Sequence, residues 1–92
     1  MKNQKLLKIR KKLDKLDDKF LSLVKKRTLL VNQVLLTKKF KNQIIDKKRI
    51  KKILSTIKSK SQKRNIDKKI TNEIWKAMIN AYIKYEFRNF KN

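Results

Sequence analysis

The stretch LLKIRKKLDKLDDKFLSLVKKRTLLVNQV, residues 6–34, decides the fold of this chain, because its apolar side chains recur every three or four positions. This spacing places them along one face of an α-helix. The row consists of Leu6, Ile9, Leu13, Leu16, Phe20, Leu23, Arg27, Leu30 and Val34. The pattern predicts a helix over about residues 5–39 with a buried apolar face, on the order of 50 Å long at roughly 1.5 Å per residue.

Two shorter helices are expected after it. Residues 40–45 lose the spacing, and Asp46 then stands where an N-cap would begin a helix over about residues 46–60. The apolar row of this second helix is Ile50, Ile53, Leu54 and Ile57. Asp67 offers a further N-cap, which predicts a third helix over about residues 67–90. Strand-like alternation is missing, so we expect an all-α chain that forms a single domain over residues 1–92.

The third helix carries two neighbouring rows of side chains. The row expected to be buried is Ile70, Ile74, Ala77, Met78, Ala81 and Tyr85. A second row brings Trp75, Ile79, Tyr82 and Glu86 beside it. Glu86 is thereby predicted to lie on or next to the apolar face, either paired with a cation within the fold or facing a ligand.

The size of the chain favours an assembly of two copies. A globule of 92 residues has a radius of gyration of about 12 to 13 Å, which is much shorter than the predicted first helix. That helix would overhang a monomeric core and needs a second chain to cover it. We therefore expect a homodimer.

The composition excludes several chemistries. Cysteine and histidine are both absent, and the seven acidic residues show no clustered ligand spacing, so we expect no metal and no cofactor. There is no long apolar run and no secretory signal pattern, which predicts a cytoplasmic protein without membrane association. The formal net charge of +22 favours binding to polyanions. However, lysine together with much Asn and Ile is also the product of AT-rich codon usage, so nucleic acid binding is expected to be at most non-specific.

Three cations share one side of the predicted first helix. Arg27 is the only charge in the apolar row, and burying an unpartnered guanidinium costs several kcal/mol, so a ligand or an acidic side chain should meet it. Arg10 and Lys38 lie in the adjacent row. Arg10 and Arg27 are about 25 Å apart along a helix, too far for one compact ligand, so Arg10 is expected to reach a site on a partner chain.

Two local motifs match a known family. Residues 9–17, IRKKLDKLD, are similar to the family's first-turn arginine followed by leucine and aspartate, and residues 23–27, LVKKR, are similar to its L-L-x-x-R motif. With Lys38, Asp46-x-x-Arg49 and a polar residue late in the third helix, the chain resembles the all-helical (AroQ-class) chorismate mutases. The resemblance implies an intertwined helical homodimer that converts chorismate to prephenate in the shikimate pathway of aromatic amino acid biosynthesis.

The resemblance also implies roles for individual residues. Arg27 and the partner chain's Arg10 would hold the two substrate carboxylates, with Arg49 assisting, and Lys38 would bind a carboxylate and the ether oxygen of the breaking bond. Asp46 would be an N-cap that also borders the substrate, and Tyr82 would line the pocket. A Claisen rearrangement needs a folded conformer and charge stabilisation, without a nucleophile, a general base or a cofactor.

Two positions depart from the mutase pattern. The family's glutamate after the second-helix arginine is Ile50 here, and its late glutamine is Glu86, which would help the developing oxyanion only as the protonated acid. Ile50 and the segment Ala81-Tyr82-Ile83 favour the related isochorismate pyruvate lyases, which share the fold and the cationic site. Both reactions stay open, together with a basic helical nucleic-acid-binding protein and a coiled-coil assembly module.

Overall fold

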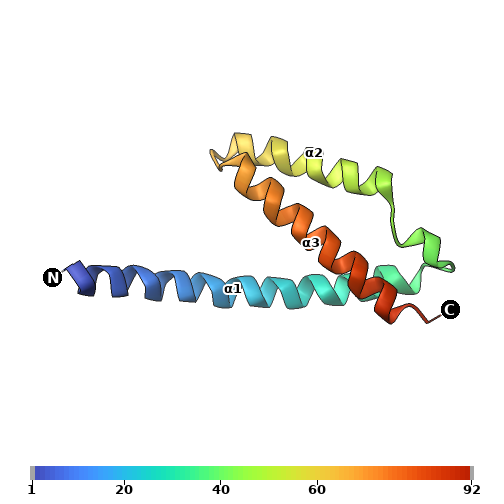
Figure 1. Ribbon diagram of the computed structural model, residues 1–92, viewed down its shortest axis with the longest axis horizontal. Coiled ribbons are helices and arrows are strands. Elements are labelled where there is room, and N and C mark those ends of the chain that lie inside the picture. Colours follow the sequence, from blue (N-terminus) through green and yellow to red (C-terminus); the bar gives the residue numbers. More distant parts are fainter. Residues whose placement is uncertain (1, 92) are drawn as a thin grey trace. The chain divides into compact units, whose positions relative to one another are not determined.

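The computed structural model describes residues 2–91 and is all-α, as predicted (Figure 1). Its elements follow in the order α1 (Lys2–Leu36), the short 3-10 helix η1 (Lys41–Gln43), α2 (Lys47–Lys63) and α3 (Lys68–Asn89). Contacts within the chain divide it into two compact units. The first unit is α1 up to Gln33, and the second runs from Val34 through η1, α2 and α3.

The long helix α1 ends at Leu36, before the predicted end at Lys39. The amides of Thr37 and Lys38 donate to carbonyls three residues back, at 3.0 and 3.1 Å, so the last turn tightens. The Thr37 hydroxyl also donates to the carbonyl oxygen of Val34 at 2.6 Å, which satisfies a helix-end acceptor. Lys38 consequently lies beyond the helix, in the segment that leads to η1.

The apolar row of α1 is exposed in the single chain, and its burial by a second chain stays a prediction. Leu16, Leu23 and Leu30 are 57%, 61% and 60% exposed. Arg27, in the same row, is half-buried. A helix this long cannot bury its whole apolar face in a chain of this size, which is why the burial implied by the pattern is missing.

Helix α2 begins as predicted and continues past the predicted end at residue 60. The Asp46 carboxylate caps it by accepting the amide hydrogen of Arg49 at 3.0 Å, which confirms the predicted N-cap. At the other end Asn65 adopts φ 55°, and the amide of Ile66 donates to the carbonyl oxygen of Ser61 at 2.9 Å. This is the αL helix ending that usually employs glycine, and asparagine is the residue that best replaces it.

Helix α3 begins at the other predicted N-cap, because the Asp67 carboxylate accepts the amide hydrogen of Lys69 at 2.8 Å. The predicted row is buried only in part, since Ile70 and Ile74 are 56% and 39% exposed whereas Met78 and Tyr85 are half-buried. The better buried stripe consists of Thr71, Trp75, Ile79, Tyr82 and Glu86. The first and last residues of this stripe are polar. A prediction based on apolar side chains therefore favoured the neighbouring face of the helix.

Helices α2 and α3 pack against each other as a hairpin (Figure 1). They are joined at residues 64–67, which we call the closed end, and spread apart toward the segment that precedes α2. We call that side the open end; it contains the start of α2, the last turns of α3 and the segment 37–46. At the closed end the buried hydroxyls of Ser61 and Thr71 lie 2.8 Å apart.

Candidate active site at the open end of the hairpin

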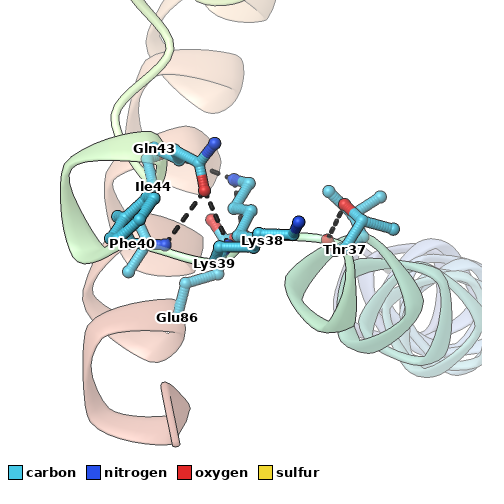
Figure 2. A network of polar contacts seen from close by, with 8 residues as sticks. Thr37, Lys38, Lys39, Phe40, Gln43, Ile44 and Glu86 are labelled. Carbon is cyan, nitrogen blue, oxygen red and sulfur yellow. Dashed lines mark hydrogen bonds and ion pairs between the residues drawn. The ribbon is translucent and has the colours of Figure 1, made fainter. Parts of the chain in front are cut away.

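A lysine and a glutamate meet at the open end (Figure 2). The Nζ atom of Lys38 lies 3.1 Å from Oε1 of Glu86, although the two residues are 48 positions apart in the sequence. Their side chains are only 16% and 9% exposed. The fold therefore brings together the two residues that the sequence proposed for the centre of the site.

Lys38 has a second acceptor within the same unit. Its Nζ atom lies 3.5 Å from the carbonyl oxygen of Ile44, a long contact, and Ile44 is itself 3% exposed. An ammonium group has three hydrogens to donate. With Glu86 and Ile44 as its partners among the described residues, Lys38 retains capacity for one acceptor of a bound ligand.

The pairing is one of the two expectations for Glu86, and the other, that Glu86 faces a ligand, stays a prediction. Glu86 is paired with a cation, and the cation is the candidate ligand-binding Lys38. Removing two charges from water is costly, and their attraction offsets that cost only while both partners stay together. An anionic ligand that takes the third hydrogen of Lys38 must therefore compete with the Glu86 carboxylate for the positive charge of the lysine, unless Glu86 is protonated.

A hollow of about 590 Å³ lies on the segment that carries Lys38. Its lining residues are Thr37, Lys38, Gln43, Ile45, Asp46 and Lys47. It thus brings two predicted site residues, Lys38 and Asp46, to one surface. A second hollow of about 610 Å³ lies between α2 and the start of α3, so the residues and not the volume distinguish the one beside Lys38.

The other predicted residues of this unit lie on the two helices. Arg49 is exposed and Ile50 is half-buried, both in the first turn of α2. Tyr82 is half-buried one turn before Glu86 on α3, and its ring meets the ring of Tyr85 edge-on with centroids 6.3 Å apart. The start of α2 and the end of α3 both belong to the open end (Figure 1).

The remaining two predicted residues belong to α1 in the first unit. Arg10 is exposed, and Arg27 is half-buried. Arg27 is less exposed than the leucines before and after it in the apolar row, Leu23 and Leu30. This partial burial is what a cation prepared to bind a ligand requires, and it is also found for a structural arginine.

Sequence reasoning missed Gln43. Its Oε1 atom accepts the amide hydrogens of Lys39 at 2.7 Å and Phe40 at 3.0 Å, directly after Lys38 (Figure 2). Gln43 is the third residue of η1 and Phe40 is its N-cap. Glutamine three residues after an N-cap is half of a capping box, but Phe40 is not a typical N-cap, so the signal was concealed.

Two further features of the chain bear on metal ions and membranes. Among the described residues, no group of three His, Cys, Asp or Glu side chains is placed to hold a metal ion. None of the helices in residues 2–91 combines the length and the apolar character needed to cross a bilayer.

Fold and site together define a small all-α protein whose helical hairpin holds a half-enclosed lysine–glutamate pair beside a polar hollow. The family model described as chorismate mutase type II matches residues 9–87, and the chain belongs to that family. The match includes both units and every predicted site residue. No curated protein matches the chain significantly, and no solved structure does.

Proposed function

We propose that this protein is a chorismate mutase that converts chorismate to prephenate. The observation that carries the proposal is the contact of 3.1 Å between Lys38 and Glu86 in a chain of the chorismate mutase type II family. In the reaction the ether C–O bond breaks while a C–C bond forms within the same molecule. The enzyme has to supply only orientation and stabilisation of the charge that develops on the ether oxygen.

Lys38 is the residue to which we assign that stabilisation. Its ammonium group is largely removed from water, which strengthens its interaction with a developing negative charge. Its spare hydrogen would be donated to the ether oxygen, and its charge would attract a substrate carboxylate. Because its position is fixed before the substrate arrives, little reorganisation is needed in the transition state.

The arginines would hold the two substrate carboxylates. We assign this role to Arg27 and to Arg10 of a second copy of the chain, with Arg49 assisting. A guanidinium offers a planar pair of donors that matches a carboxylate, so it fixes orientation as well as charge. Asp46, which caps α2 and borders the hollow beside Lys38, and Tyr82 on α3 would complete the walls of the site.

Glu86 would act as a protonated acid. A carboxylate beside the ether oxygen would repel the charge that develops there, whereas a carboxylic acid donates a hydrogen bond to it. In the observed pair the carboxylate contacts Lys38. Uptake of a proton by Glu86 would end this competition and leave the Lys38 ammonium to the substrate.

A second copy of the chain would complete the active unit. The apolar row of α1 is more than half exposed at Leu13, Leu16 and Phe20, and such a continuous stripe is rarely left in water. The occupant we propose is α1 of a second copy, which would cover the stripe and bring Arg10 to the other copy's site. The result would be an intertwined homodimer with two equivalent sites.

Isochorismate pyruvate lyase activity is the second candidate, and Ile50 is the observation that favours it. A mutase site usually offers a glutamate there for the substrate hydroxyl, but this half-buried side chain is apolar. Elimination of pyruvate from isochorismate breaks the same kind of ether bond, so the same cations would serve. The site residues are therefore shared, and the substrate decides between the two reactions.

The deciding experiment incubates the purified protein with chorismate and, separately, with isochorismate. Prephenate from chorismate would support the mutase, and pyruvate with salicylate from isochorismate would transfer the assignment to the lyase. A preparation purified in the same way from host cells that lack the gene measures the activity of any contaminating enzyme. The oligomeric state is read from sedimentation of the purified protein.

A folded dimer that forms neither product would overturn the proposal. The basic surface would then be tested by titrating a random oligonucleotide at increasing salt. Tight binding at physiological salt that Arg27→Ala leaves intact would favour a nucleic-acid-binding protein. Binding that disappears with a modest increase in salt would indicate only a charged surface.

A further inference from the structure

We propose that Gln43 is a positioning residue that fixes Lys38 for catalysis. This inference rests on the proposed function and adds to it a residue that does not itself reach the reacting atoms. It starts from the segment 37–46, which has to place Lys38 accurately although it contains neither glycine nor proline. Without those residues, the shape of the segment depends on hydrogen bonds from side chains.

The first step of the argument is the contact of Gln43 with the backbone. One oxygen, Oε1, accepts the amide hydrogens of Lys39 and Phe40 at 2.7 and 3.0 Å (Figure 2). These are the two peptide groups that follow Lys38. The carbonyl oxygen of Phe40 in turn accepts the amide hydrogen of Gln43 at 3.0 Å. Phe40 and Gln43 are therefore joined by two hydrogen bonds, one in each direction.

The second step concerns the backbone before Lys38. The amide of Lys38 donates to the carbonyl oxygen of Leu35 at 3.1 Å, at the end of α1. Lys38 is therefore tied to α1 on one side and to Gln43 on the other. A residue held on both sides loses little further conformational freedom when its side chain meets a ligand.

The third step connects Gln43 with the ammonium group. Ile44, the next residue after Gln43, offers its carbonyl oxygen to Lys38 Nζ, and Ile44 is buried. Fixing Gln43 therefore also fixes this acceptor of the Lys38 side chain (Figure 2). Backbone and side chain of Lys38 are held through neighbouring residues of one short segment.

The consequence for the reaction is a dependence of turnover on a residue outside the catalytic contact. A shift of about 1 Å in a catalytic group can lower the rate by about 10²-fold. Gln43→Met keeps the length of the side chain and removes the acceptor. We expect kcat to fall by about 10-fold and KM to change by less than about threefold, because orientation is lost and charge is not.

Two variants make the test specific. Gln43→Glu retains an oxygen at the same position and should keep at least about half of the wild-type kcat, since a carboxylate accepts the same two hydrogens. Gln62→Met changes an exposed glutamine on α2 by the same substitution and should leave kcat and KM unchanged. A Gln43→Met enzyme as active as Gln62→Met would overturn the proposal.

Combination with Lys38→Met tests whether Gln43 acts through Lys38. If it does, Gln43→Met causes no further loss in the Lys38→Met background, because there is no ammonium group left to position. An undiminished further loss of about 10-fold would contradict the assignment. The comparison needs the residual activity of Lys38→Met to be measured above the uncatalysed rate at high enzyme concentration.

Amide hydrogen exchange of Lys39 and Phe40, followed by NMR, provides a measurement that does not need the reaction. Gln43→Met should speed exchange at both amides, while Gln43→Glu and Gln62→Met should not. Unchanged exchange in Gln43→Met would overturn the positioning role. If the wild type lacked activity while exchange responded as expected, the proposed function would fail and the structural role of Gln43 would stand.

Discussion

The two ends of the α2–α3 hairpin each hold one close pair of poorly exposed polar side chains, but the pairs differ in charge and in completeness. At the closed end, the Ser61 hydroxyl lies 2.8 Å from that of Thr71 and donates to the carbonyl oxygen of Ile57 at 2.7 Å. At the open end, Lys38 and Glu86 lie 3.1 Å apart as an ion pair. Ser61 and Thr71 are 3% and 9% exposed.

The difference separates a structural contact from a functional one. The two hydroxyls are neutral, and their hydrogens are used between them and on backbone carbonyls, so this pair has no hydrogen left to donate to a ligand. The ion pair is costly to maintain away from water, and its lysine has a hydrogen to spare. A fold that keeps such a pair next to a hollow has a surface prepared for an anion.

Lys38→Met should have the largest effect on activity and little effect on the closed end. Removing the donor to the ether oxygen should lower kcat/KM by about 10³-fold or more. Steady-state kinetics with chorismate, together with circular dichroism, would measure this. Lys39→Met is the matched control, because Lys39 is an exposed neighbour and should retain wild-type activity. Equal losses in the two variants would refute the assignment of the charge stabilisation to Lys38.

Arg27→Ala extends the comparison to α1. A carboxylate clamp lost from a water-poor site should reduce kcat/KM by about 10² to 10³-fold. Lys26→Ala, which removes an exposed neighbouring charge, serves as the control and should have little effect. Near-normal turnover in Arg27→Ala would exclude it from the site while leaving Lys38 in place.

Glu86→Gln sharpens the comparison by removing charge without removing size. If the protonated acid is the useful form, the glutamine variant should keep or exceed the wild-type kcat/KM at neutral pH, because its amide is a permanent donor to the ether oxygen and carries no negative charge. Steady-state kinetics with chorismate measures this. A loss of more than about 10-fold in a folded Glu86→Gln protein would contradict the role of Glu86.

Thr71→Val should have the smallest effect on activity. It removes one hydroxyl at the closed end and should destabilise the fold by about 1 kcal/mol, with kcat unchanged. Urea unfolding measures the stability at fixed protein concentration, and Thr71→Ser is the conservative control that retains the hydroxyl. A large loss of kcat in a folded Thr71→Val protein would show that the closed end contributes to catalysis.

The helices were predictable from the sequence, but several of their details were not. Apolar spacing and the caps Asp46 and Asp67 were sufficient to place three helices. The end of α1 depends on backbone hydrogen bonds to carbonyls three residues earlier, and the end of α2 depends on the αL conformation of Asn65. The spacing of apolar residues predicts neither. On α3 the sequence named the row that contains Glu86 but not the buried Thr71, whose burial arises from tertiary contacts.

The candidate site was likewise predictable from the sequence only in part. The resemblance nominated Lys38 and Glu86 separately, and the structure added that they form a pair. Gln43 was invisible, because its role arises from two backbone amides of its own segment and not from a motif. A sequence can indicate which side chains do chemistry more readily than which ones hold them in place.

The turns built without proline also determine how refolding experiments can be interpreted. Slow phases of tens of seconds in protein refolding commonly reflect prolyl isomerisation. This chain has no proline, so that source of a slow phase is absent. A slow phase whose rate increases with protein concentration would then report the association of chains. If enzyme activity returns at the same rate as this phase, the active enzyme forms only when the chains associate.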